Sequence, residues 1–164
     1  MGMCAAVMAL TQLTTAAQDN LPHGWREPTR EEASGSWRQK SPTLFLKVKA
    51  DFKGDGIADV AQIFVDPSRN KFGLFVKFGG AGQWQLVRDY DLTFLGRYGI
   101  DYVKPGKYET ACGKGYGDWA CAHNEPDWLQ LSHPGIDLFY TESSDSIYFW
   151  DQSSPKFREV VMSD

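Results

Sequence analysis

The sequence predicts a mainly β fold, either an antiparallel sandwich or an open barrel-like sheet, with one short N-terminal helix. Apolar and polar residues alternate with a period of two in several short segments, which is the pattern of half-buried strands. Gly, Pro, Asn, Asp and Ser separate these segments, and helical periodicity is almost absent. At 164 residues, with 42% hydrophobic and 14% aromatic residues, the chain matches one domain with a real core.

The first 17 residues resemble a secretory signal peptide. They carry no charge, contain an apolar run from Met3 to Leu10 and end in Ala16 and Ala17. The basic residues that usually begin such a leader are missing, as in a truncated leader. The apolar run is much shorter than the roughly 20 residues of a membrane-spanning helix. We therefore expect an exported bacterial protein, periplasmic or secreted and not transmembrane, with residues 18–164 forming a single β-rich domain.

The elements of this domain follow from local patterns. Thr29 and Glu32 have the spacing of a capping box, which predicts a short helix over residues 30–35 that ends at Gly35. Period-two alternation and flanking turn residues predict strands over residues 43–50, 59–66, 71–78, 83–89, 107–112, 128–131, 136–141, 146–150 and 156–162. The last two strands are expected to form a hairpin whose turn contains Pro155.

Two cysteines remain outside the leader, Cys112 and Cys121, in the glycine-rich segment ACGKGYGDWAC. An even pair in an exported protein indicates a disulfide, and the glycines allow the two ends to meet. The alternative is a metal site that adds His123. That site would have neither a CxxC pair nor a second histidine at ligand spacing.

The segment ADFKGDGIADVAQIFV, residues 50–65, places three carboxylates just before an apolar strand. If Asp51 is position 1 of a calcium loop, ligand oxygens fall at Asp51, Asp55 and Asp59 and at the Ile57 carbonyl, with Gly56 at the sharp turn. The pattern therefore predicts most of a calcium site.

Residues 51–61, DFKGDGIADVA, resemble the D-x-[DN]-x-D-G-x-x-D calcium loops of FG-GAP and VCBS-type repeats, in which the loop precedes a β-strand. The resemblance implies Ca²⁺ as a ligand. Lys53 stands where those loops have Asp or Asn, and Gln62 stands where the last carboxylate would be, so the implied site is weak or degenerate. The alternative is an ion-free turn in which Lys53 pairs with Asp51 or Asp55.

Composition and motifs argue against two classes of function. The net charge of −4 and the absence of a basic run argue against nucleic-acid binding. No serine-hydrolase, zinc-hydrolase, Walker A or dinucleotide motif is present, and His23, His123 and His133 lie in segments expected to be loops. We therefore do not expect an enzyme.

The charge distribution favours a binding protein. Residues 1–100 carry 12 basic and 10 acidic side chains, whereas residues 101–164 carry 5 and 11. The overall style is similar to small periplasmic immunity and inhibitor proteins of bacteria, which implies a basic secreted cell-wall-degrading hydrolase or toxin as partner. The candidate contact residues are Tyr116, Asp118, Trp119, His123, Glu125, Asp127 and Tyr140. The alternative is a calcium-dependent carbohydrate or cell-surface binding module.

Overall fold

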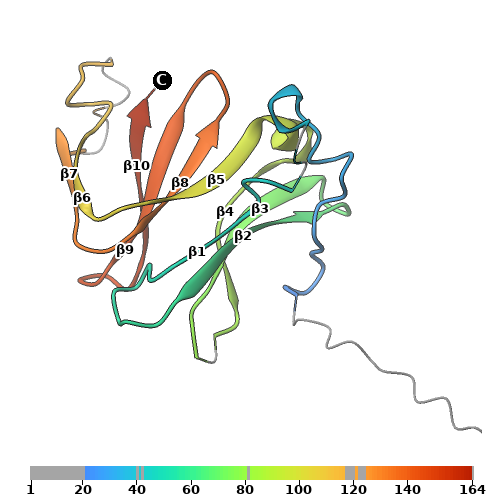
Figure 1. Ribbon diagram of the computed structural model, residues 1–164, viewed down its shortest axis with the longest axis horizontal. Coiled ribbons are helices and arrows are strands. Elements are labelled where there is room, and N and C mark those ends of the chain that lie inside the picture. Colours follow the sequence, from blue (N-terminus) through green and yellow to red (C-terminus); the bar gives the residue numbers. More distant parts are fainter. Residues whose placement is uncertain are drawn as a thin grey trace, which may run out of the picture.

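Antiparallel strands dominate the fold (Figure 1). The computed structural model describes residues 21–39, 41, 43–80, 82–116, 121 and 125–163. Its strands are β1 (Lys47–Ala50), β2 (Asp59–Asp66), β3 (Lys71–Lys77), β4 (Trp84–Asp91), β5 (Tyr98–Val103), β6 (Gly106–Glu109), β7 (Trp128–Leu131), β8 (Gly135–Tyr140), β9 (Asp145–Asp151) and β10 (Lys156–Ser163). Two 3-10 helices accompany them, η1 (Ser36–Arg38) and η2 (Leu92–Arg97).

The strands form two four-stranded sheets and a separate hairpin. Sheet A has the order β1-β2-β3-β4, sheet B has the order β10-β9-β8-β5, and β6 pairs with β7. Every pairing is antiparallel. The edges of the two sheets meet where the Ile100 amide of β5 donates to the Phe45 carbonyl, at 2.8 Å. The described sheets do not close into a barrel, and the mainly β, sandwich-like prediction is confirmed.

One hydrophobic core lies between the inner faces of sheets A and B. Alternate residues of each strand point into it, as the period-two pattern requires. The buried core residues include Ile63, Val65, Phe72, Leu74 and Val76 from sheet A, and Ile100, Ile136, Leu138 and Tyr148 from sheet B. The hydroxyls of Tyr90 and Tyr148 lie 2.9 Å apart and link the two sheets across this core.

The outer face of sheet A is covered by the segment that precedes the sheet. Trp25 packs edge-on against Phe75, with ring centroids 4.8 Å apart, and Phe64 beneath them is fully buried. The Arg26 amide donates to the Val65 carbonyl at 2.9 Å and holds the segment in place. Because both faces of β2 and β3 are buried, these strands are almost continuously apolar.

The outer face of sheet B is covered by the β6–β7 hairpin, at the left of Figure 1. Leu129 and Leu131 of β7 form a second cluster with Ile147, Val160 and Met162 of β9 and β10. The domain therefore has a covering layer on the far side of each sheet, and the β6–β7 layer positions the candidate site described below.

Several local predictions differ from the structure, and one is the strand over residues 107–112, which ends at Glu109 because Ala111 and Cys112 lie in a turn. The capping box forms, with the Glu32 amide 3.2 Å from Thr29 Oγ1 and the Thr29 amide 2.8 Å from the Glu32 carboxylate, yet residues 30–33 make only a turn. The backbone is extended at Gly35, and helical residues begin at Ser36. The first strand begins at Lys47 instead of residue 43, because Phe45 adopts a left-handed φ of 60° that interrupts extended structure.

Within the part of the chain that the structure describes, no helix has the length and apolar character needed to cross a membrane.

Candidate functional site

Residues 51–58, the acidic loop, connect β1 to β2 and fold around the Asp51 carboxylate. This carboxylate accepts backbone N–H bonds from Gly54 at 2.7 Å, Asp55 at 3.1 Å and Gly56 at 2.8 Å. Gly54 and Gly56 have φ values of 76° and 84°, which glycine adopts without strain. Burial alone would raise the pKa of Asp51, but these three hydrogen bonds outweigh it and lower the pKa.

The other two predicted carboxylate ligands, Asp55 and Asp59, are also engaged by the protein. Asp59 is 1% exposed and accepts from the amides of Gly79, at 2.8 Å, and Lys53, at 3.1 Å. Asp55 accepts from the Ile57 amide, and its other oxygen lies 3.4 Å from the Lys53 ammonium. Among the described residues, no group of three His, Cys, Asp or Glu side chains is arranged to hold a metal ion. Lys53 thus pairs with Asp55, and calcium binding stays a prediction.

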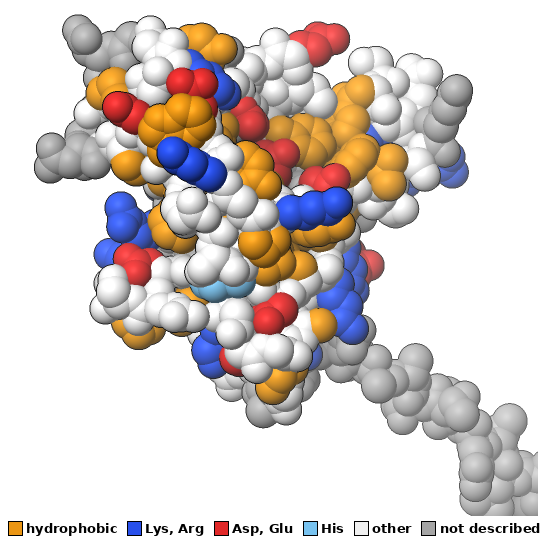
Figure 2. Space-filling view, turned by 60° about the vertical axis from the view of Figure 1, so that its left-hand side comes forward, with side chains coloured by type: hydrophobic (Ala, Val, Ile, Leu, Met, Phe, Trp, Pro, Cys, Tyr) orange, Lys and Arg blue, Asp and Glu red, His pale blue; other side chains and the backbone are white. Residues whose placement is uncertain are grey.

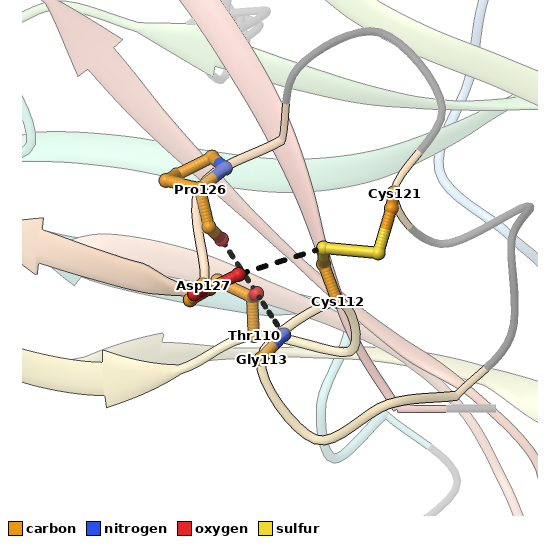
Figure 3. Close-up of a disulfide and its surroundings, with 6 residues drawn as sticks. All are labelled: Thr110, Cys112, Gly113, Cys121, Pro126 and Asp127. Atoms are coloured by element: carbon orange, nitrogen blue, oxygen red, sulfur yellow. Dashed lines mark hydrogen bonds between the residues drawn. A yellow bond between two sulfur atoms is a disulfide. The ribbon is translucent and has the colours of Figure 1, made fainter.

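The disulfide between Cys112 and Cys121 forms, with Cα atoms 4.8 Å apart (Figure 3). The loop that it closes is tied to the chain before β7 through the buried Thr110. The Thr110 hydroxyl donates to the Pro126 carbonyl at 2.7 Å and accepts from the Gly113 amide at 3.1 Å. The loop is therefore anchored at both ends to the β6–β7 hairpin.

Four of the seven predicted contact residues lie among the residues that the structure describes. Tyr116 is 44% exposed in the disulfide loop, and Asp127 is exposed 3.8 Å from the Cys112 sulfur. Glu125 is half-buried just before β7. Tyr140 lies at the end of β8, where its described ring contacts are with Tyr98 and Arg97. The other three, Asp118, Trp119 and His123, lie outside the described residues.

A recess of about 320 Å³ lies beside the disulfide loop, between the β6–β7 hairpin and the outer face of sheet B. Its apolar lining consists of Val103, Tyr108, Ile147 and Met162. Its charged lining consists of Glu109, Lys114, Asp137 and Asp145. Figure 2, in which the hairpin side is turned forward, shows acidic side chains lying among hydrophobic ones in the upper half of this face.

Asp137 is the most perturbed carboxyl group of the recess. Its Oδ1 atom is buried without a hydrogen-bond partner, and Asp101 of β5 stands directly opposite it in the strand register. Burial, followed by the charges of Asp145 and Asp101, raises the pKa of Asp137 to about 7. A carboxyl group with such a pKa changes its charge near neutral pH. A cation that enters the recess would stabilise its ionised form.

The described histidines do not converge on one site. His23 lines a recess on the side of sheet A with Trp84, and His133 lines a smaller one with Trp150 and Asp151. An enzymatic function, which the sequence does not predict, would need two of the histidines or carboxylates to share one pocket. Among the described residues, His133 and Asp151 share the smaller recess, while Glu109, Asp137 and Asp145 share the Asp137 recess, which contains no histidine.

Comparison with known proteins adds no relative, since no family model, curated protein or solved structure matches the chain. The candidate site therefore rests on its own geometry. Sequence reasoning found the disulfide loop but missed Asp137, Asp145, Glu109 and Lys114. The sequence carries no direct signal for Asp137, because an acid between two apolar strand residues ordinarily faces solvent.

Proposed function

We propose that this chain is an exported binding protein that acts as an immunity or inhibitor protein against a basic, secreted cell-wall-degrading hydrolase or toxin. The observation that carries this proposal is the position of the disulfide loop beside the acidic recess. Lys114 and Tyr116 belong to the loop, and Lys114 also lines the recess. An anchored loop with an exposed aromatic side chain next to an acidic hollow suits a basic protein surface.

The covering layers support the same proposal. The disulfide and the hydrogen bonds of Thr110 fix the loop ends to a hairpin that is itself packed on sheet B. A binding loop held in this way loses less conformational entropy when it meets a partner. The negative net charge of residues 101–164, which include the loop and the recess, adds electrostatic attraction for a basic enzyme.

The test is inhibition of lytic activity by the oxidised protein. We would assay c-type, g-type and i-type lysozymes and any lytic effector encoded beside this gene, each at stoichiometric and at hundredfold ratios. We expect at least one enzyme to lose activity near a stoichiometric ratio. Full activity of every enzyme at the hundredfold ratio would contradict the proposal.

A matched pair of variants locates the contact surface. Tyr116 and Phe94 are exposed to similar extents, 44% and 50%, but Phe94 lies in η2, away from the recess lining. Tyr116→Ala is expected to weaken inhibition roughly tenfold or more, whereas Phe94→Ala should leave it unchanged. Equal losses for the two variants would place the contact elsewhere.

A calcium-dependent carbohydrate-binding module is the second candidate, and exposed aromatic rings favour it. Trp128 in β7 is 47% exposed, and Tyr116 lies in the adjoining disulfide loop. This candidate requires the acidic loop to bind Ca²⁺. Excess calcium would then raise the unfolding midpoint by several degrees relative to EDTA, and Asp55→Ala would abolish the rise. An unchanged midpoint would exclude the calcium-dependent candidate.

A further inference from the structure

The recess on the outer face of sheet B has an amphipathic lining. Ile147 and Met162 are buried members of the cluster beneath the hairpin, and Val103 and Tyr108 pack against that cluster. Asp137 and Asp145 come from neighbouring strands of sheet B and add acidic groups to the same hollow. A ligand that fills it needs an apolar body and a positive end.

The recess contains three carboxyl groups and one ammonium group, Lys114, so its negative charge is only partly compensated by the described residues. None of the described ion pairs includes Asp137. The Lys114 ammonium is engaged by the Met162 carbonyl at 2.7 Å. The acidic neighbours Asp145 and Asp101 accept hydrogen bonds from the Ser163 hydroxyl and the Tyr102 amide, and their negative charge disfavours ionisation of Asp137. An incoming cation would therefore be the ion-pair partner that Asp137 lacks.

The lining also selects the kind of cation. No three acidic, His or Cys side chains among the described residues are arranged to hold a metal ion, which disfavours a divalent cation. A guanidinium group on an aliphatic stem suits the recess better. The planar fork of arginine binds carboxylates with two parallel hydrogen bonds, and its methylene groups pack on apolar walls.

We infer that this recess binds an arginine side chain presented by the partner protein, with the guanidinium group at Asp137 and Asp145 and the stem against Ile147 and Met162. This inference rests on the proposed function, because it names the chemical group through which a basic hydrolase or toxin would be held. It assigns Asp137 as a binding residue.

The experiment uses acetyl-arginine methylamide as the probe and follows the carboxyl carbons of the intact oxidised protein by NMR. The groups that face Asp137 are Asp101 from β5, Asp145 from β9 and, from the hairpin and loop, Glu109 and Lys114. Saturating probe is expected to lower the apparent pKa of Asp137 by about one unit or more, because it binds the ionised form. Acetyl-citrulline methylamide, which has the same shape without the charge, should leave the pKa unchanged.

Variants and a second ion complete the test. Asp137→Asn should weaken binding of the arginine probe roughly tenfold, whereas Asp89→Asn on β4 of sheet A should leave it unaltered. Circular dichroism of both variants shows whether the fold is kept. An equal effect of the citrulline probe, no shift with arginine, or a larger shift with calcium chloride would overturn the inference.

The outcome separates this inference from the proposed function. If the arginine probe fails while a hydrolase is inhibited, the partner binds this chain without using the recess and the inference is wrong. If the probe binds but no hydrolase is inhibited, the recess assignment stands and the proposed inhibitor function is wrong.

Discussion

On the outer face of sheet A, Glu32 and Asp66 have arginine partners, and on sheet B Asp151 pairs with Arg158, whereas Asp137 has no such partner among the described residues. Arg26 forms two hydrogen bonds with Glu32, at 2.7 and 2.8 Å, and lowers the pKa of Glu32 to about 2. Hydrogen bonds from Ser68 and Arg69 likewise lower the pKa of Asp66 to about 2. The pKa of Asp137 moves in the opposite direction, to about 7.

This difference separates a structural surface from a candidate binding surface. The paired carboxylates Glu32 and Asp66 stabilise the folded protein in their ionised form. An unpaired, partly buried carboxylate costs stability when it ionises, and groups of this kind are enriched at functional sites. Both covering layers therefore bury apolar clusters, but the β6–β7 layer also borders a recess that contains an unpaired carboxyl group.

The largest expected effect tests whether the sheet A covering layer is a true core. Phe64→Ala removes a fully buried ring beneath Trp25 and is expected to lower the free energy of unfolding by about 4 kcal/mol. Urea denaturation measures the loss. Phe94→Ala, at an exposed ring, should cost less than about 0.5 kcal/mol. A loss below about 1 kcal/mol for Phe64→Ala would mean that the N-terminal segment does not pack on this face.

The next largest effect concerns the disulfide that anchors the loop beside sheet B. Replacing Cys112 and Cys121 together by serine is expected to lower the free energy of unfolding by about 3 kcal/mol. The reason is that a disulfide across nine residues no longer restrains the unfolded chain. Denaturation of the oxidised protein, the reduced protein and the double variant checks this. The reduced protein should match the variant, and equal stability of all three would argue against a native disulfide.

Asp137→Asn is expected to stabilise the protein. This variant tests whether the unpaired carboxyl group, unlike the paired ones, destabilises the fold when it ionises. The folded protein keeps the Asp137 proton between the unfolded pKa of 3.8 and the folded value of about 7, so wild-type stability falls as pH rises through that window. The asparagine variant lacks this loss. Because Asp137 is only partly buried and solvent screens its charge, we expect a gain of about 2 kcal/mol at pH 8 and almost nothing below pH of about 4. Thermal unfolding across pH measures the gain, and Asp89→Asn serves as control. A gain that does not depend on pH would refute ionisation of the buried carboxyl group as its cause.

Glu32→Gln should have the smallest effect and the opposite sign. The lowered pKa of Glu32 means that its stabilising contribution is present above the unfolded value of 4.5 and is lost as pH falls toward about 2. Because the pair is partly exposed, we expect a loss of about 1 kcal/mol at pH 7 and none near the acid limit. Glu31→Gln, at an exposed neighbour, is the control for denaturation at both pH values. Equal effects of the two variants would show that the Arg26 pair contributes nothing.

Local patterns predicted much of the sheet structure. Residues 59–66 and 128–131 are strands with the predicted bounds, because each has a clear apolar pattern between turn residues. The closing hairpin of β9 and β10 also forms, with Pro155 in its turn. In contrast, β5 was missed. Gly99 and Asp101 interrupt its apolar pattern, and Gly99 is needed because the rings of Phe139 and Trp37 fill the space that a Cβ atom would take.

The disulfide could be predicted from two cysteines and a leader-like start, but the recess could not. Asp137 lies in the segment GIDLFY, where alternation places it on the face opposite Ile136 and Leu138. Nothing local shows that a hairpin from residues 106–131 covers that face, or that Asp101 and Asp145 stand beside Asp137. Such sites depend on contacts between residues distant in sequence, which periodicity does not encode.

Asp137 differs in its electrostatic state from the arginine-paired carboxylates Glu32 and Asp66, and NMR titration of the carboxyl carbons tests this difference most directly. We predict that Asp137 titrates near pH 7, while Glu32 and Asp66 titrate near pH 2. A midpoint for Asp137 below a pH of about 5 would mean that its charge is already compensated or solvated, and would contradict the recess as an acceptor for a basic side chain.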